Sequence, residues 1–274
     1  MKKIMFTKHL EGLDVAGIIQ NLKAATVEGA DLCVRPGYPV NPENITKALP
    51  AATKAFADEG LVIPLVTAPG DFTRPDIDYA EEFYAACGEA GVGHIKLGYW
   101  HWSPAVHYWD QLDEVRGFME GFEKLSAKTG VKTVVHNHSG KSMGLNSCAA
   151  MNVVQGFDPV HVGIFTDPGH LSLCGEPIEM AVDIVRDYLS IFAFKDLIKY
   201  RPQGRKDQGT RKTGVVRLGT GFGDWPALIK TLKAINFQGP VSFHSEYSGE
   251  DVPTVTDLCR IDVRFIKSLW NEVE

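Results

Sequence analysis

The sequence lacks the features that mark secreted, membrane and nucleic-acid-binding proteins. Its five cysteines contain no CxxC pair and are odd in number, which favours reduced, mostly buried thiols over a disulfide framework. No apolar run reaches the roughly 18 residues that cross a membrane, and the basic start of the chain lacks the apolar core of a signal peptide. The net charge of −6 argues against a nucleic-acid or anionic membrane surface. We therefore expect a cytoplasmic protein that binds neither nucleic acid nor a membrane.

Strand-like and helix-like patterns alternate along all 274 residues, with no linker-like stretch between them. Apolar, β-branched runs predict strands at 3–7, 31–35, 61–67, 94–98, 131–139, 162–166, 191–195 and 241–246. Amphipathic stretches predict helices at 14–26, 41–58, 76–90, 105–129, 142–155, 177–188, 224–235 and 254–270. Asn41 is expected to cap the second helix, with Pro42 at its first position.

This alternation predicts an α/β fold, a single (β/α)8 TIM barrel over residues 1–274. The rival fold is an open doubly wound sheet, which would carry a dinucleotide or phosphate loop after its first strand. Residues 8–12, Lys-His-Leu-Glu-Gly, match neither a GxGxxG motif nor a P-loop. The barrel is therefore favoured, and its active site is expected where the strands end.

Three predicted strands end in side chains that suit catalysis or metal binding. His136 and His138 are two residues apart, so they point to the same side of their strand. The same alternation predicts a set of inward side chains near the other strand ends, which comprises Lys8, Arg35, Lys96, Asp167, Ala193, Lys195, His244 and Glu246. His170 follows one of these strands after Pro-Gly. Any one of these groups could be a hydrogen-bonded core residue, but together they predict an active site.

The chemistry of this set points to a transition metal and a buried amine. Imidazole and carboxylate ligands suit Mn²⁺, Zn²⁺, Fe²⁺ or Co²⁺ better than Ca²⁺. Lys195 would be buried beside them, and a buried lysine needs a partner. It could pair with Glu246 or Asp167, hold a substrate oxygen, or act as a base or Schiff-base amine. Asp196 has the opposite parity and is expected to face the outer helices or cap a turn.

Three connections could belong to the same site. The aromatic cluster at 99–102 and 108–109, which includes Trp100, could form a wall for a sugar or pack between helices. The glycine-rich segment 219–223 could hold an anion on its N–H groups or form a tight connection. Residues 198–218 are rich in Lys, Arg, Gly and Gln and are expected to form a lid or binding loop. Its cations are Lys199, Arg201, Arg205, Lys206, Arg211 and Lys212.

Five segments resemble the sugar phosphate isomerase/epimerase-type proteins of the xylose isomerase-like TIM-barrel superfamily. They are Val-Val-His-Asn-His-Ser-Gly (134–140), Thr-Asp-Pro-Gly-His-Leu (166–171), Phe-Ala-Phe-Lys-Asp-Leu (192–197), Gly-Thr-Gly-Phe-Gly-Asp-Trp (219–225) and Phe-Gln-Gly-Pro-Val-Ser-Phe-His-Ser-Glu-Tyr (237–247). The resemblance covers essentially the whole chain and identifies the superfamily, which includes ketose 3-epimerases, inosose dehydratases, hydroxypyruvate isomerases and endonuclease IV. It does not identify the substrate.

The resemblance implies a divalent metal held by Glu, Asp, His and Glu from the last four strands. In this sequence those positions hold His136, Asp167, Ala193 and His244, so only the aspartate is retained and the alanine cannot bind metal. The substrate-contacting histidine of the family matches His170. A rebuilt site would use His136, Asp167 and His244 for Mn, Zn, Co, Fe or Mg.

The function expected from this resemblance is a sugar or keto-sugar isomerase or epimerase that moves a proton next to a carbonyl. Glu246, Lys195 and His138 are the expected catalytic residues. His170, Arg35, Lys96 and Trp100 are expected to bind a sugar or sugar-derivative substrate. The alternatives are a lyase or hydrolase on keto-sugars or glycosides, and a catalytically silent carbohydrate-binding barrel. DNA repair of the endonuclease IV type fits an acidic chain poorly. A homo-oligomer is left open.

Overall fold

Eight parallel strands close into a barrel in this computed structural model, which describes residues 1–202 and 211–273. The strands are β1 (Lys3–Phe6), β2 (Gly29–Cys33), β3 (Val62–Thr67), β4 (His94–Lys96), β5 (Lys132–His136), β6 (Val162–Thr166), β7 (Leu189–Phe194) and β10 (Val241–Phe243). Their order around the barrel follows the chain, and β1 closes it by pairing with both β2 and β10. The predicted (β/α)8 barrel is confirmed.

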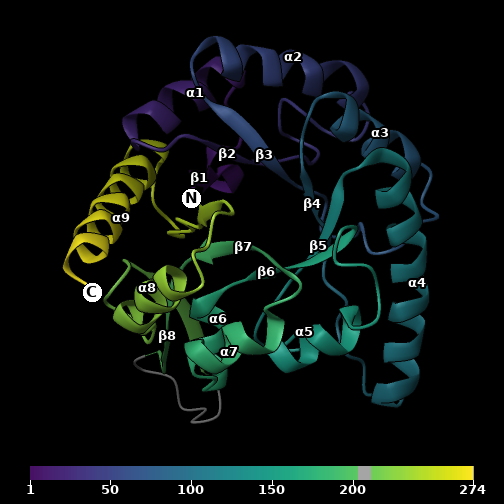
Figure 1. The fold of residues 1–274 in the computed structure, drawn as a ribbon. Coiled ribbons are helices and arrows are strands. Elements are labelled where there is room, and N and C mark those ends of the chain that lie inside the picture. Colours follow the sequence, from purple (N-terminus) through teal and green to yellow (C-terminus); the bar gives the residue numbers. More distant parts are fainter. Residues whose placement is uncertain (203–210, 274) are drawn as a thin grey trace.

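Helices surround the barrel and cover the outer faces of its strands (Figure 1). They are α1 (Val15–Ala24), α2 (Ile45–Asp58), α3 (Ala80–Glu89), α4 (Tyr108–Thr129), α5 (Ser147–Val154), α6 (Pro168–Cys174), α7 (Ile178–Val185), α8 (Trp225–Ala234) and α9 (Val252–Glu272). A 3-10 turn, η1 (Thr7–Leu10), follows β1. None of these helices is both long and apolar enough to span a bilayer.

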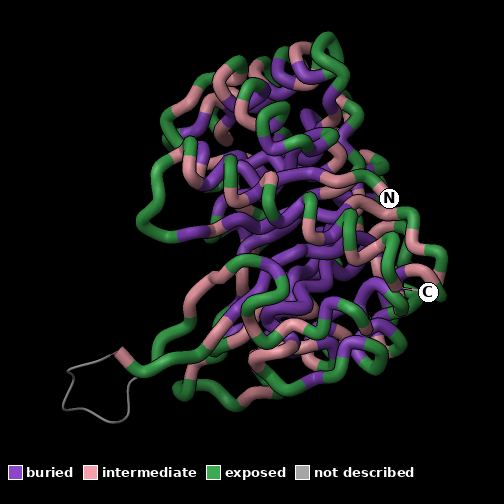
Figure 2. The backbone as a smooth tube through the Cα atoms, turned by 90° about the vertical axis from the view of Figure 1, so that its left-hand side faces the viewer, coloured by how far each residue is buried: buried purple, intermediate pink, exposed green. Residues whose placement is uncertain are grey.

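The strands have apolar side chains on both faces because each is covered on both sides. Inside the barrel, Ile4, Leu65, Val134, Phe165, Ile191 and Ala193 form a closed core layer. A much larger apolar layer lies between the strands and the helices. Figure 2 shows the buried strands running through the middle of the molecule, beneath exposed helices and loops. The inner layer forms a rigid floor below the polar strand ends.

One predicted helix start is wrong, and one helix was missed. Asn44, not Asn41, is the N-cap of α2, and Asn41 instead accepts a hydrogen bond from the backbone N–H of Glu43 within the preceding loop. Pro42 therefore lies before the helix. The sequence reading also missed α6, which begins directly after β6 and is capped by the Asp167 side chain through the His170 N–H at 3.1 Å.

The segment 198–218 is not the loop that the sequence suggested. Asp196–Tyr200 (β8) and Lys212–Val216 (β9) pair as an antiparallel two-stranded ribbon. The ribbon leaves the barrel after β7 and projects from the body of the molecule (Figure 2). Among its expected cations, Arg205 and Lys206 lie outside the described residues. A role of this ribbon as a lid remains a prediction.

The glycine-rich segment 219–223 forms a tight connection around a buried carboxylate. Asp196 accepts hydrogen bonds from the N–H groups of Gly219, Gly221 and Gly223 at 2.9–3.0 Å, and from the indole N–H of Trp225 at 2.9 Å. A Cβ at position 221 would lie 2.2 Å from that carboxylate, which explains the glycine there. The internal carboxylate occupies the donors that an external anion would need, so this segment is not an anion site.

Candidate active site

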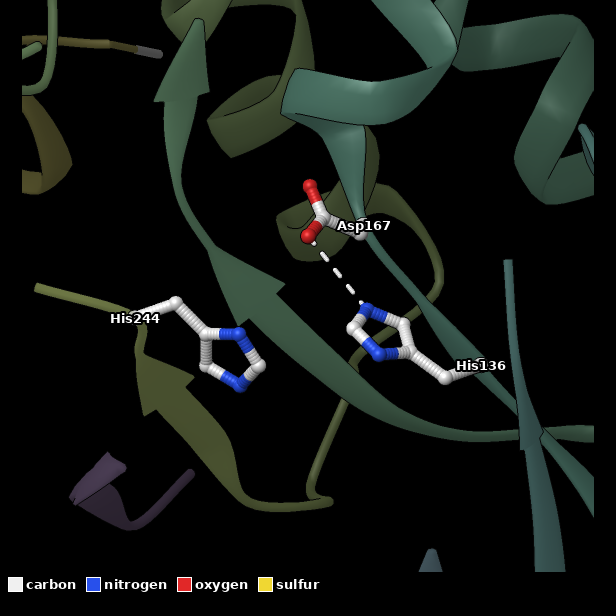
Figure 3. A group of neighbouring side chains, drawn as sticks. All are labelled: His136, Asp167 and His244. Atoms are coloured by element: carbon white, nitrogen blue, oxygen red, sulfur yellow. Dashed lines mark hydrogen bonds and ion pairs between the residues drawn. The ribbon is translucent and has the colours of Figure 1, made fainter. Parts of the chain in front are cut away.

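Three strand ends bring potential metal ligands together at the mouth of the barrel. His136 ends β5, Asp167 follows β6, and His244 follows β10. Each contributes one ligand-type atom to a group in which all such atoms lie within 4.8 Å of one another, and all three residues are buried. Figure 3 shows the side chains pointing toward one another from separate strands. The chain thus brings together the three ligands that the sequence analysis named.

His136 is fixed by a partner on each ring nitrogen. Its Nε2 lies 3.3 Å from Asp167 Oδ2, and its Nδ1 lies 2.8 Å from the hydroxyl of Tyr99. The ring stacks on Phe165, with centroids 4.5 Å apart. Burial, and after it the charge of His244, lowers the pKa of His136 well below 6.5, so the imidazole is neutral near pH 7. A neutral imidazole is the form that binds a metal.

His244 is oriented by Asp31, a carboxylate buried inside the barrel on β2. The Nε2 of His244 lies 3.3 Å from Asp31 Oδ2. Asp31 also accepts hydrogen bonds from Thr67 and Ser242 at 2.6 and 2.9 Å. Burial opposes the charged form of His244, but the nearby carboxylates of Asp31 and Glu246 outweigh it and raise the pKa. The Nδ1 atom is buried, and among the described residues it has no hydrogen-bond partner.

Glu246 lies between two lysines. Its Oε2 is 2.5 Å from Lys195 Nζ, and its Oε1 is 2.7 Å from Lys8 Nζ. Burial would raise the pKa of Glu246, but the charge of Lys195 outweighs burial and lowers it well below 4.5. Burial likewise opposes the charge of Lys195, and the carboxylates of Glu246 and Asp167 raise its pKa above the ordinary value. The carboxylate and the amine are therefore both charged.

Two further histidines form one wall of the mouth. The rings of His138 and His170 lie 3.9 Å apart. His170 Nδ1 is 2.8 Å from the hydroxyl of Ser139, and its Nε2 is 3.4 Å from Lys195 Nζ. Burial lowers the pKa of His138 to about 4 and that of His170 well below 6.5. Both rings are neutral near pH 7, so they can accept or relay a proton without carrying a resting charge.

Of the other residues expected to bind substrate, Lys96 and Arg35 lie at strand ends on the barrel mouth, whereas Trp100 does not. Lys96 is 3% exposed, and its Nζ lies 3.7 Å from the centroid of the Tyr99 ring, next to His136. Arg35 is half-buried at the end of β2. Trp100, in contrast, belongs to the outer core, and its indole N–H donates to the Thr73 carbonyl at 2.8 Å. The structure does not bring Trp100 to the histidine cluster, and the neighbouring Tyr99 takes that position.

Sequence reasoning missed Asp31, Tyr99 and Ser139. Asp31 shares the inward parity of Arg35 on the same strand, so the alternation rule could have found it. Tyr99 belongs to the aromatic cluster that the sequence analysis named. It lies in a loop, however, where no periodic pattern predicts which side chain points into the barrel. The contact of Ser139 with His170 depends on the turn after β5 and had no signal in the sequence.

The residues present fit a divalent metal. The Asp31–His244 pair is the carboxylate–histidine arrangement that usually supports a metal ligand, and it leaves the unpartnered Nδ1 for the ion. Tyr99 can orient His136 in the same way through its Nδ1. Ala193, at the position of the usual histidine ligand, is part of the inner core and adds no ligand. The donor set of two imidazoles and carboxylates suits Zn²⁺, Mn²⁺, Fe²⁺ or Co²⁺.

Solved structures with this fold include several sugar epimerases. The 3-keto-D-glucoside 4-epimerase YcjR from E. coli has 18% identity and a TM-score of 0.73, with 98% of this chain and 99% of that chain covered. The IolI protein with a bound zinc atom has 16% identity, a TM-score of 0.77 and the same coverage. The D-psicose 3-epimerase from Clostridium cellulolyticum H10, solved with D-tagatose, has 13% identity, a TM-score of 0.71 and again the same coverage. At these identities the likeness concerns the fold.

A search of the curated proteins gives no sequence match. A family model does match, and it covers residues 18–269, from α1 to the end region of α9. The closed barrel, the ligands at its strand ends and this match agree, and the chain belongs to the xylose isomerase-like TIM-barrel family.

Proposed function

We propose that this protein is a keto-sugar isomerase or epimerase that moves a proton on the carbon next to a carbonyl with the help of a divalent metal. One observation carries the proposal: ligand atoms of His136, Asp167 and His244 converge within 4.8 Å at the barrel mouth. Glu246 adds a carboxylate 3.7 Å from His244 Nδ1. The activities named for the epimerases of the same fold agree with it.

A bound metal would polarise the substrate carbonyl and stabilise the enediolate oxygen that forms when the proton leaves. His136, Asp167 and His244 would hold it. Glu246, ionised at neutral pH, takes the proton from the carbon. Lys195 lies 2.5 Å from that carboxylate and keeps its charge, so it returns a proton or holds a substrate oxygen. His138 and His170 lie side by side, with His170 3.4 Å from Lys195, and can relay a proton to or from the substrate.

The test is exchange of substrate hydrogen with solvent deuterium. The enzyme, purified without chelator and then loaded with Mn²⁺ or Zn²⁺, is incubated in D₂O with a panel of ketoses and 3-keto-glycosides, and deuterium next to the carbonyl is followed by NMR. We expect exchange with at least one class, and a loss of about 10²–10⁴-fold in Glu246→Gln, as is typical for a general base. His107→Ala changes an exposed histidine outside the cluster and is the matched control.

Elemental analysis of the same preparations tests the metal. About one metal ion per chain is expected in the wild type and in His107→Ala, and little in His244→Ala. If neither metal nor exchange is found after incubation with Mn²⁺, the proposal of a metal-assisted proton transfer is wrong. A silent carbohydrate-binding barrel would then remain, and it predicts sugar binding without exchange.

A further inference from the structure

We propose that the substrate carries an anionic group, a carboxylate or a phosphate, and that Arg35 and Lys96 bind it beside the metal ligands. This inference rests on the proposed function, because it names the class of substrate for the same barrel mouth. It is carried by two cations, one just after β2 and one at the end of β4, that form no ion pair among the described residues.

Arg35 and Lys96 are connected by the backbone of the strand between them. The Nε of Arg35 donates to the carbonyl of Ala68 at 3.3 Å. The N–H of Ala68 donates in turn to the carbonyl of Lys96 at 3.0 Å. Arg35 and Lys96 are therefore both held against the backbone of Ala68, on the part of the barrel mouth formed by β2, β3 and β4. The guanidinium uses only its Nε in this contact, which leaves its two terminal nitrogens for a ligand.

The carboxylates of the site are engaged elsewhere. Glu246 is paired with Lys195 and Lys8. Asp31 accepts from Thr67, Ser242 and His244, and Asp167 lies against His136 and Lys195. In the part of the chain that the structure describes, neither Arg35 nor Lys96 makes an ion pair. Arg35 and Lys96 therefore remain available to a group on a bound substrate.

Lys96 shows why an anion is the group that fits. A buried ammonium without a partner is costly, and burial followed by the charge of Arg35 lowers the pKa of Lys96 to about 7. The charges of Asp31 and Glu246 favour the ammonium less strongly than burial opposes it, and the ring of Tyr99 lies 3.7 Å from its Nζ. A carboxylate or phosphate on the substrate would supply the missing countercharge, and Arg35 could grip it through two parallel hydrogen bonds.

The position of Lys96 also determines how far a bound anionic group would lie from the reacting carbon. Lys96 lies on one side of Tyr99, and the Tyr99 hydroxyl is 2.8 Å from His136 Nδ1. The Tyr99 ring therefore lies between Lys96 and His136, a proposed metal ligand. An anionic group a few bonds from the carbonyl would reach them while the carbonyl faces the metal. This arrangement selects sugar acids or sugar phosphates over neutral ketoses.

Calorimetric titration of the metal-loaded protein tests the inference. The probes are D-glucuronate, glucose 6-phosphate and neutral glucose. We expect one anionic sugar to bind at least 10-fold more tightly than glucose, and its identity distinguishes a carboxylate from a phosphate. Arg35→Gln and Lys96→Met should each remove this advantage. The exposed cations Arg264 and Lys230 supply the matched controls, Arg264→Gln and Lys230→Met, which should retain it. A thermal melt of each variant confirms that it is folded.

Equal affinity for the three sugars, or an anion preference that survives in both Arg35→Gln and Lys96→Met, would overturn the inference. The two proposals fail separately. Deuterium exchange into neutral ketoses without any preference for anions keeps the proposed function and rejects the anion site. Selective anion binding that depends on Arg35, with no exchange into any anionic or neutral keto-sugar, keeps the anion site and rejects the isomerase function.

Discussion

Lys96 combines burial, positive charge and the absence of an ion pair within the described chain. Its pKa falls from 10.5 in the unfolded chain to about 7 in the fold, because burial disfavours the ammonium. Between these values the unfolded chain binds more protons, so this group's contribution to stability improves as the pH rises from 7 to about 10. Below pH 7 the penalty is of the order of 5 kcal/mol.

Lys96→Met should therefore be more stable than the wild type near pH 7, and its advantage should shrink as the pH approaches 10. Urea unfolding at a series of pH values measures the difference in the free energy of unfolding. Lys230→Met removes an exposed lysine and should show a difference near zero at every pH. A constant difference across the range for Lys96→Met would mean that the buried amine does not titrate as described.

We expect Asp31 to act on the proposed metal site through His244, without touching the ion. Asp31→Asn keeps the shape of the side chain but removes the charge that favours the Nε2–H form of His244. We expect the affinity for Zn²⁺ to fall about 10–100-fold, measured by competition with a chromogenic chelator. The carboxylate that caps α8, Asp224, provides the control, because Asp224→Asn lies away from the cluster and should leave the affinity unchanged. Unchanged affinity in Asp31→Asn would leave this carboxylate with a purely structural role.

At the scale of single residues, the sequence predicts best those side chains that a regular strand places. His136, Asp167 and His244 follow from the alternation of faces on apolar strands, and the structure brings them together. Trp100 and Tyr99 lie in a loop, where no such rule applies; the prediction named Trp100, whereas the structure places Tyr99 beside His136. The unpartnered nitrogen of His244 depends on contacts among three strands and is visible only in the fold.

At the scale of elements, the connection after β7 depends on one carboxylate. Asp196 satisfies the N–H groups of three glycines and the indole of Trp225, and it is fully buried. Asp196→Ala would leave these donors without an acceptor, which costs about 1–3 kcal/mol for each buried group. We expect a loss of at least about 3 kcal/mol in the free energy of unfolding.

Asp224→Ala provides a comparison within the same connection. Asp224 caps α8 through one hydrogen bond to the Ala227 N–H at 3.0 Å, so its loss should cost only about 1 kcal/mol. Chemical denaturation of both variants measures the contrast. Equal losses would show that the glycine segment finds other acceptors when the Asp196 carboxylate is removed.

Strands were predicted more closely than helix ends and connections. The apolar run at 162–166 coincides with β6, because a strand covered on both faces leaves a continuous signal. The ribbon of β8 and β9 was missed because the segment's many Lys, Arg, Gly and Gln residues resemble a loop, and only the pairing of the two segments makes them strands. The short helix α6 was missed because it starts at Pro168-Gly169, a pair that commonly marks a turn.

At the scale of the molecule, a metal that joins β5, β6 and β10 should stabilise the folded barrel. Ligand at about 100 times its Kd adds about 2.7 kcal/mol to the free energy of unfolding. We therefore expect Zn²⁺ or Mn²⁺ to raise the Tm of the chelator-treated protein by several degrees. His107→Ala should respond like the wild type and His244→Ala should not. An equal shift in His244→Ala would place the stabilising ion elsewhere.

The pairing of β1 with β10 also determines when the barrel can close during translation. Lys3 pairs with Val241, and Lys8 meets Glu246 across 238 positions of sequence. During translation β1 emerges first, yet its second neighbour is synthesised only after the other strands. One edge of the nascent sheet therefore stays open until β10 leaves the exit tunnel, and the histidine and glutamate that complete the active site arrive together with the strand that seals this edge.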